Sequence, residues 1–564
     1  MRITRFFRSI MSTNYVDAPI GIKIISFLSK KLCPRWQINR VLCFKISVLL
    51  LTYLAYMCYH MTRKPISVVK SILHRNCSAV ELPKDFPHND QIADDSNWCD
   101  YPPFDGDDAS ALLGTLDSSF LFAYAIAMFV SGFVAERVSL RYFLTFGMLF
   151  SGIFCYLFGL GKTYNIHSFA YFAFVQAMAG IFQTSGWPGV VTVVGRWFGK
   201  SKRGLIYGVW NSHTSLGNIL GTLIAANYVE TDWSMSFIMP GFIMGLIGML
   251  LFFFLVDDPE LVNCHEKVGG NPSAGSSNSS SYRRLESGSN IHDSGDSDVD
   301  DTDIVVGEQE NASIRSLRGS VISHTEVSMR VNERTPILSS NPSINSKATA
   351  EDAIGFCGAL KIPGVVEFSL CLFFSKLVSY TFLYWLPLYI QSTTTIGVKL
   401  SADLSVVFDI GGIIGAIAAG CISDYTGMSA ATCVGLLGAA VPMLLIYQFW
   451  GALSMPISIF LLFVVGALVN GPYALITTSV SAELGTHKSL NGNAKALATV
   501  TAIIDGTGSI GAAVGPLLAG VVSTSGWQNV FYMLMISDVL AMILLIRLVI
   551  KEFSLWRRRN SRIE

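Results

Sequence analysis

Long apolar stretches separated by polar connections fill most of the chain. Twelve of them are long enough to cross a bilayer, at about 42–68, 111–135, 141–160, 168–195, 204–228 and 234–256, and then at about 364–391, 403–423, 428–449, 454–481, 494–522 and 526–550. A backbone in lipid must satisfy its polar groups internally, so each stretch is predicted to be a helix. The pattern therefore predicts an all-α membrane protein of twelve transmembrane helices in two six-helix halves, residues 42–256 and 363–552.

Composition supports the same class of protein. Hydrophobic residues make up 51% of the chain and charged residues only 14%, whereas a soluble domain carries about a quarter charged residues. The formal net charge of +0 gives no reason to expect a nucleic-acid partner. The sequence shows no nucleophile constellation, phosphate-binding loop or metal-ligand spacing. We therefore predict a protein of the lipid bilayer that is not an enzyme and uses no cofactor and no metal.

The charges of the connections predict an orientation. The tails, residues 1–41 and 553–564, are basic and are expected in the cytosol, because Lys and Arg are retained on that side. The connection at 70–110 is acidic and is expected in the lumen or outside. It contains an acceptor sequence for N-glycosylation at Asn76. It also holds Cys77 and Cys99, which a disulfide would join in an oxidising compartment.

Residues 257–362 differ in kind from the rest of the chain. They are rich in Ser, Gly, Asn and Asp and hold too few apolar residues to offset the entropy of ordering. We expect a disordered linker on the cytosolic side. Within it, Glu333, Ile337 and Leu338 form a short match to the acidic dileucine signals that sorting adaptors bind. That match makes the lysosomal or endosomal membrane one alternative for the location of the protein.

The two halves repeat short motifs in register. Gly132 precedes Glu136 by four residues at the end of the second stretch, and Gly420 precedes Asp424 in the same way at the end of the eighth. Glycine–proline motifs also recur, Gly186-Trp187-Pro188 in the fourth stretch and Gly471-Pro472 in the tenth. Repeats across six-helix halves are typical of transporters, whose substrate site lies near the midplane between the halves.

These motifs resemble those of the major facilitator superfamily. Within it, the chain resembles the organophosphate:phosphate antiporters, most closely the animal sugar-phosphate exchangers. The matching stretches are Tyr59-His-Met-Thr-Arg63-Lys64, Gly186-Trp187-Pro188-Gly189, Arg196-Trp197-Phe198, Lys202-Arg203-Gly204, Val209-Trp210-Asn211 and Tyr384-Trp385-Leu386-Pro387. The resemblance implies the facilitator fold and exchange of a phosphorylated sugar or glycerol phosphate for inorganic phosphate by alternating access. It also implies the endoplasmic reticulum membrane, and we expect a monomer as the transport unit.

The resemblance extends to individual residues, but at several positions this chain differs from the bacterial relative. In the bacterial glycerol-phosphate carrier, one arginine from each half faces the substrate phosphate; the first corresponds to Arg63, and the second falls on Ser379. Lys376 precedes Ser379 by three residues, about one helical turn. The helix-five histidine of the relatives falls on Thr214, beside His213. A helix-two lysine is Met128 here, whereas the nearby tyrosine is kept as Tyr124.

A phosphate ester carries nearly two negative charges, and an unpaired buried ion costs several kcal/mol. We therefore predict that Arg63 and Lys376, one from each half, form a cationic site. The guanidinium of arginine suits phosphate because it binds two oxygens at once. Further candidates for substrate contact are Lys64, His213, Tyr59, Tyr124 and Tyr384. Candidate gate residues at helix ends are Glu136, Arg137, Arg141 and Asp424.

Two carboxylates keep other interpretations open. Asp409 and Asp505 lie in apolar stretches, where either would pair with Lys376 or carry a proton together with a substrate. The second case would make the protein a proton-coupled organic-anion symporter. A third alternative is a non-transporting solute sensor or interaction subunit that signals through the linker, because a fold does not establish function.

Overall fold

The computed structural model describes residues 18–32, 39–74, 100–135, 137–198, 210–264, 356–485 and 495–560, and every regular element in these ranges is helical. The elements of the first half are α2 (Ile20–Leu32), α3 (Arg40–Arg63), α4 (Pro65–Leu73), α5 (Ala109–Ala135), α6 (Leu140–Thr163), α7 (Phe169–Gln183), α8 (Gly186–Phe198), α10 (His213–Tyr228), α11 (Met235–Phe254) and the short η2 (Pro259–Val262). Those of the second half are α12 (Phe356–Leu360), α13 (Val365–Thr393), α14 (Val398–Thr426), α15 (Ser429–Trp450), α16 (Met455–Leu475), η3 (Ile476–Val480), α17 (Ser481–Leu484), α18 (Lys495–Ser523) and α19 (Trp527–Asn560).

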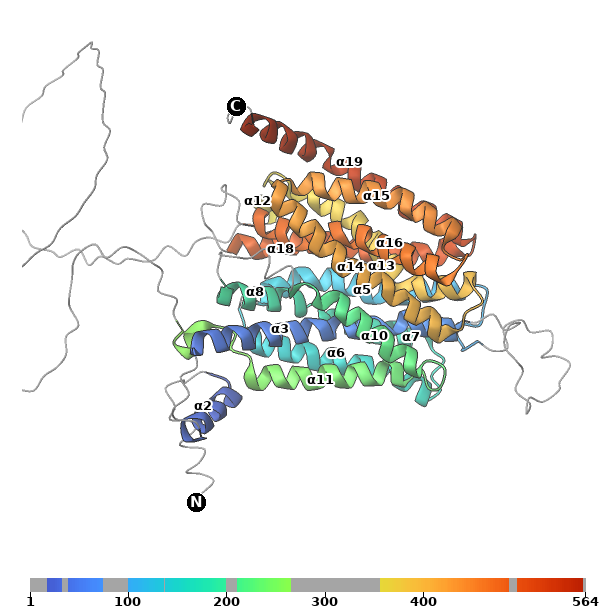
Figure 1. The fold of residues 1–564 in the computed structure, drawn as a ribbon. Helices are drawn as coiled ribbons and strands as arrows, with labels where there is room; N and C mark the ends of the chain where they lie inside the picture. Colours follow the sequence, from blue (N-terminus) through green and yellow to red (C-terminus); the bar gives the residue numbers. More distant parts are fainter. Residues whose placement is uncertain are drawn as a thin grey trace, which may run out of the picture. The chain divides into compact units, whose positions relative to one another are not determined.

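Figure 1 shows the helices of the first half, coloured blue to green, beside those of the second half, coloured yellow to red. Across the boundary α5 packs on α18, α10 on α14, and α4 on α13. We call the end of the bundle where α4 finishes and α5 begins the first-loop end. The opposite end, where α11 finishes and α13 begins, is the linker end. These two ends correspond to the predicted lumenal and cytosolic sides.

Most predicted spans are present, and the breaks within the first and fourth spans lie next to proline and glycine. Ten described helical stretches are long and apolar enough to cross a membrane. The expected fourth span is divided into α7 and α8 at Thr184 and Ser185, just before Gly186 and Pro188, and the described part of the fifth is the shorter α10. The first span bends at Pro65, which cannot donate a backbone hydrogen bond, and then continues to Leu73.

The structure adds helices at three places where the sequence predicted connections or tails. The connection expected to begin at residue 70 begins after Leu73, so Lys70 is a buried helical residue. The expected tail 1–41 contains α2. Ala18, just before this helix, and Ile22 within it are buried in an apolar cluster with residues of α3, α6 and α11. The edges of the expected linker are helical, as η2 and α12. The predictions for Asn76, Cys77, Cys99, Glu333, Ile337 and Leu338 fall outside the described residues.

Close helix contacts within the second half require glycine. A Cβ atom at Gly411 of α14 would meet the carbonyl oxygen of Phe463 on α16, and one at Gly511 of α18 would meet that of Phe373 on α13. Backbone contact of this kind replaces the hydrophobic effect as a source of helix association in lipid. It fixes α18 against α13, the two helices that carry Asp505 and Lys376.

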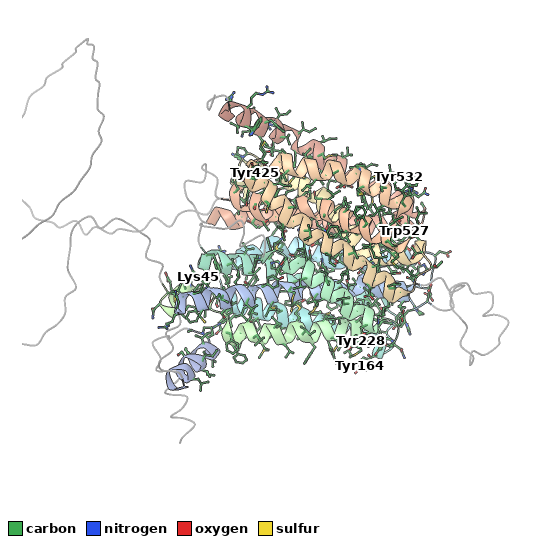
Figure 2. The ribbon with its side chains drawn as sticks, in the orientation of Figure 1. Lys45, Tyr164, Tyr228, Tyr425, Trp527 and Tyr532 are labelled. Carbon is green, nitrogen blue, oxygen red and sulfur yellow. The ribbon has the colours of Figure 1, made fainter. Side chains whose placement is uncertain are left out.

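The outer surface has the pattern of a membrane protein. Large apolar side chains such as Ile126 and Phe242 are 71% and 61% exposed on it. Figure 2 shows Tyr164, Tyr228 and Trp527 near the first-loop end, and Tyr425 and Lys45 near the linker end. Aromatic side chains gather at membrane–water boundaries because one part of each ring is apolar and another is polar.

We predict that His74 makes stability at the first-loop end depend on pH. Its Nδ1 lies 2.8 Å from Asp100 Oδ2. This hydrogen bond raises the pKa of His74 even though partial burial opposes the charge. The stabilisation is therefore complete below the unfolded pKa, about 6.5, and disappears as the pH rises through the raised folded pKa.

The measurement is the thermal unfolding midpoint of purified wild type and His74→Gln at about pH 5.5 and about pH 8.5. The variant should lose more stability at the acidic pH. His167→Gln is a matched control, because His167 lies at the same end and contacts the Pro102 carbonyl rather than a carboxylate. An equal loss for His74→Gln at both pH values would contradict the prediction.

Candidate functional site

Arg63 lies at the C-terminal end of α3, inside the boundary between the halves. Its side chain is 4% exposed. Nε donates to Gln183 Oε1 at 2.7 Å, and Nη1 lies 3.5 Å from the hydroxyl of Tyr380 in the second half. The guanidinium carbon is 4.7 Å from the ring centroid of Tyr124, a cation–π contact. Nη2 is buried and has no hydrogen-bond partner among the described residues.

Lys376 is the corresponding cation of the second half. Its side chain on α13 is 3% exposed. Nζ donates to Asp505 Oδ1 at 2.7 Å and to Ser509 Oγ at 3.4 Å, both on α18. The ammonium group also faces the rings of Tyr380 and Tyr473 at 6.0 and 5.6 Å. Asp505 therefore balances the charge of Lys376, which makes burial of the lysine tolerable.

The structure brings Arg63 and Lys376 to one cavity. This cationic cavity has a volume of about 10 Å³, and its lining is Tyr56, Arg63, Tyr124, Trp187, Asn211, Thr214, Lys376, Tyr380, Tyr473, Thr477 and Asp505. The lining comes from both halves and holds two cations and one carboxylate. A space of this size holds about one water molecule. The site is therefore closed around its charges and must widen to take a larger anion.

Two further cavities adjoin the cationic cavity. The amide cavity, of about 40 Å³, shares Asn211, Thr214, Tyr380 and Tyr473 with it. The linker-end cavity, of about 360 Å³, shares Trp187 and Thr477 with it and also contains Asp424 and Glu483. The three cavities thus form a series between the halves, and the largest lies toward the linker end.

The first-loop end is held together by buried polar contacts across the halves. Lys64 Nζ donates to the Leu383 carbonyl at 2.9 Å and lies 3.9 Å from Asp409 Oδ2. Lys70 pairs with Asp117 and donates to the Tyr384 carbonyl at 3.3 Å. The halves are therefore joined at the first-loop end, while a cavity separates them toward the linker end.

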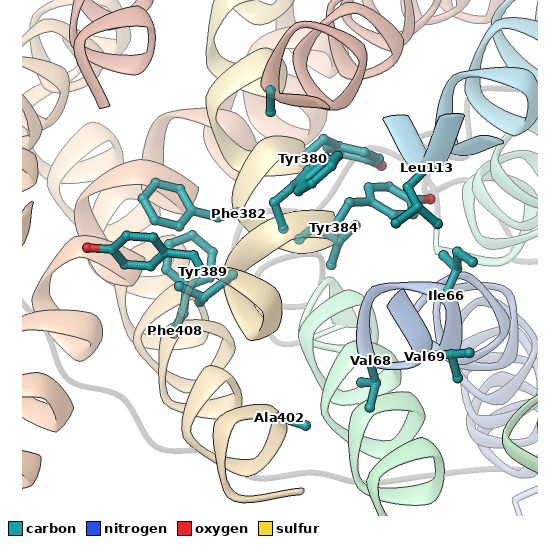
Figure 3. Packing of buried hydrophobic residues seen from close by; sticks show 14 of the residues in the cluster. Ile66, Val68, Val69, Leu113, Tyr380, Phe382, Tyr384, Tyr389, Ala402 and Phe408 are labelled. Carbon is teal, nitrogen blue, oxygen red and sulfur yellow. The ribbon is translucent and has the colours of Figure 1, made fainter. Parts of the chain in front are cut away.

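The tyrosines that we predicted as substrate contacts lie at different places. Tyr124 lines the cationic cavity beside Arg63. Tyr384 lines a separate small cavity with Arg63 and Gln183. Figure 3 shows Tyr380 and Tyr384 pointing to one side of α13, toward Leu113 and Ile66. Tyr59 instead bonds Ser185 through its hydroxyl at 2.7 Å and does not line the described cavities.

Two predicted cations do not line the three cavities, although one of them, Lys64, contacts two residues of the amide-cavity wall. Lys64 faces Leu383 and Asp409, as its position after Arg63 requires, because adjacent helical residues point in different directions. His213 is fully buried against Trp210, with ring centroids 4.4 Å apart, and its neighbour Thr214 lines the cationic cavity instead. We therefore do not place Lys64 or His213 in the candidate site.

The predicted gate residues are only partly described. Asp424 is exposed and lines the linker-end cavity. The backbone N–H of Arg141 donates to Asp257 Oδ2 at 3.3 Å, which joins the start of α6 to the end of α11 within one half. Arg137 is exposed near the same end, and Glu136 falls outside the described residues.

Several polar residues at the site were not among our candidates. Gln183, Asn218 and Asn470 are uncharged, so the cost of burying a charge, which singles out the ionisable residues, does not apply to them. Lys70 was missed because the predicted loop began there. Pro65 was the available signal, since proline is favoured in the first turn of a new helix and so predicts that the helix continues. Asp117 stood in the apolar run 111–135 and could have been noted as an intramembrane carboxylate.

Comparison with known proteins gives relatives along nearly the whole chain. Residues 102–494 match the model of the Major Facilitator Superfamily. The chain is 52% identical over 520 residues to the glucose-6-phosphate exchanger SLC37A2 of Bos taurus, which covers 92% of this chain and 96% of that protein. It is 47% identical over 548 residues to the glucose-6-phosphate exchanger SLC37A1 of Homo sapiens, covering 95% and 96%.

A solved structure shows the same fold at low identity. It is the crystal structure of a bacterial homologue of the human lysosomal transporter Spinster, in an inward-facing and unoccupied conformation. It matches with a TM-score of 0.52 and 13% identity, and covers 90% of this chain and 96% of that chain. Identity this low carries information about the fold alone.

We predict that Lys70 and Asp117 stabilise the fold only as a pair. Lys70→Met leaves the buried Asp117 unpaired, and Asp117→Asn leaves Lys70 unpaired, so each should cost about 3–5 kcal/mol of unfolding free energy. The double variant removes both charges and should cost much less than the sum of the two. Thermal unfolding midpoints of the purified variants measure the difference.

Lys162 and Asp232 supply the matched control pair. Their charges lie 2.8 Å apart but are 32% and 49% exposed at the first-loop end. Lys162→Met and Asp232→Asn should each change stability by no more than about 1 kcal/mol, because water screens an exposed pair. Additive losses for Lys70 and Asp117 would show that their charges do not interact.

Proposed function

Because the chain belongs to the major facilitator superfamily and, within it, to the glucose-6-phosphate exchangers, we propose that it exchanges a phosphorylated sugar or glycerol phosphate for inorganic phosphate by alternating access. Membership of this family, expected from the sequence motifs, is confirmed, and with it a multi-pass membrane transporter of the facilitator fold. The observation that carries the proposed substrate is the cationic cavity, in which one cation from each half faces the same buried space.

The charges of this cavity suit a phosphate group. Arg63 offers Nη2, which no described residue engages, and its planar fork binds two phosphate oxygens at once. Lys376 supplies a second charge from the other half, and Asp505 pairs with that charge. A phosphate that enters between the two cations would compete with Asp505 for Lys376. One chain supplies both cations, which supports a monomer as the transport unit.

The contacts between the halves suggest how exchange proceeds. In the described state Lys64 and Lys70 join the halves at the first-loop end, and the linker-end cavity leads to the cationic cavity. An anion that enters from the linker end would bring both halves onto one phosphate through Arg63 and Lys376. Opening the first-loop end then requires the Lys64 and Lys70 contacts to the α13 carbonyls to break. Binding energy from the anion would offset that cost.

Counterflow of labelled phosphate in proteoliposomes tests the function. Vesicles loaded with unlabelled phosphate should take up external labelled phosphate, and external glucose 6-phosphate should compete for the uptake. Uptake that instead follows a proton gradient without internal phosphate would indicate the symporter. Absence of any uptake by inserted protein would favour the sensor or interaction subunit.

Substitutions at the two cations test the site within the same assay. Arg63→Ala should reduce exchange at least 100-fold, because charge-assisted hydrogen bonds contribute about 1.5–3 kcal/mol each. Arg63→Lys should retain little activity, since an ammonium group cannot bind two oxygens in one plane. Lys376→Ala should also lose exchange activity, and Lys376→Arg should retain part of it. Near-normal exchange by Arg63→Ala would remove Arg63 from the site.

We propose the endoplasmic reticulum membrane as the location, in line with the resemblance to the animal exchangers. The competing signal is the dileucine match at Glu333, Ile337 and Leu338, which a sorting adaptor would have to bind. Replacing both Ile337 and Leu338 with alanine should therefore leave the distribution of the protein in cells unchanged. Movement of the double variant away from lysosomal or endosomal markers would contradict this location, and Glu333→Ala would then test the rest of the motif.

A further inference from the structure

The amide cavity contains polar side chains that the cationic site does not use. Asn218 Nδ2 donates to Asp409 Oδ1 at 3.0 Å, and its Oδ1 lies 3.3 Å from His60 Nδ1. Ser379 Oγ donates to Asn470 Oδ1 at 2.6 Å. These five side chains come from α3, α10, α13, α14 and α16, so they belong to both halves. They line one cavity of about 40 Å³.

Asp409 lines this cavity and has an acceptor atom that no described donor uses. The residue is 3% exposed, and its Oδ2 has no hydrogen-bond donor among the described residues. Lys64 Nζ, at 3.9 Å, balances the charge without making a hydrogen bond. A buried carboxylate oxygen without a donor is costly, and a hydroxyl group from a ligand would satisfy it. Amide groups beside it both donate and accept, which suits neighbouring hydroxyl groups.

The amide cavity lies directly beside the cationic cavity. Asn211, Thr214, Tyr380 and Tyr473 border both, so a ligand in one meets the wall of the other. The two cavities, of about 40 and about 10 Å³, are too small for a sugar phosphate in the described state. Tyr380 and Tyr473 form part of the wall of both. Both rings would have to move apart for a ligand to extend from one cavity to the other.

We propose that the amide cavity is the subsite for the hydroxyl groups of the sugar, with Asn470, Ser379 and Asp409 as specificity-determining residues. The proposal rests on the proposed exchange of sugar phosphates, in which Arg63 and Lys376 hold the phosphate. Inorganic phosphate occupies only the cationic cavity and makes no use of the amide cavity. The two substrates of one exchanger therefore differ in their dependence on Asn470 and Ser379.

The experiment compares these two substrates in proteoliposomes loaded with phosphate. Uptake of labelled phosphate and of labelled glucose 6-phosphate is measured for wild type, Asn470→Leu and Ser379→Ala. Loss of a hydrogen bond should raise the KM for glucose 6-phosphate about 5- to 10-fold in each variant. The KM for phosphate should stay within about twofold, and this exchange also shows that the variant is folded and inserted.

Hexyl phosphate, which lacks the hydroxyl groups, provides a second comparison as a competitor of phosphate uptake. Wild type should prefer glucose 6-phosphate over hexyl phosphate, and both variants should lose most of that preference. Ser405→Ala is the matched control, because Ser405 is fully buried on α14, one turn from Asp409, and its hydroxyl donates to the Ala402 carbonyl of its own helix. It should leave both KM values unchanged.

The outcomes separate the two proposals. Equal changes in the KM values for phosphate and glucose 6-phosphate in the variants, or no change in either KM, would overturn the proposed subsite. The proposed exchange function would remain intact. An unchanged preference over hexyl phosphate would have the same result. If wild type exchanges neither substrate, the proposed function fails, and the subsite fails with it.

Discussion

Charges inside a membrane protein persist only where an opposite charge or several hydrogen bonds meet them, and this constraint organises the interior of the protein. Lys70 pairs with Asp117, Lys376 with Asp505, and Lys64 lies near Asp409. Arg63 has no carboxylate partner of this kind among the described residues. It is supported by Gln183, Tyr380 and the ring of Tyr124 instead. The interior between the halves therefore keeps one positive charge for an anion.

The pairs differ in what they connect. Lys376 and Asp505 belong to the same half, so their ion pair does not resist movement of one half against the other. Lys64 and Lys70 belong to the first half and donate to carbonyls of α13 in the second. Those bonds do resist opening at the first-loop end. A buried lysine is thus paired within one half in one place and joins the two halves in another, depending on which helix its partner occupies.

Close packing keeps the second half rigid enough for this division of roles. Backbone contacts at Gly411 and Gly511 bring α14 to α16 and α18 to α13 without intervening side chains. Asp505 is then fixed relative to Lys376, and Asn470 relative to Asp409. The cationic and amide cavities are consequently built on helix surfaces and not on loops. The polar side chains that line these cavities are those that the packed helices turn toward each other.

The sequence by itself determined the class of protein, its two halves, most of the membrane spans and the presence of Arg63 as a cation inside a span. Those features are local, because apolar length specifies a span and an arginine inside a span implies a partner or a ligand. The tertiary structure decided which neighbour each ion has, as with Lys376 and Asp505, which lie 129 positions apart in the chain. It also decided that Thr214 and not His213 lines the cationic and amide cavities, and that Asn218 and Asn470 line the amide cavity. These depend on the rotation of each helix about its axis, which packing across the bundle sets and which no single stretch of sequence contains.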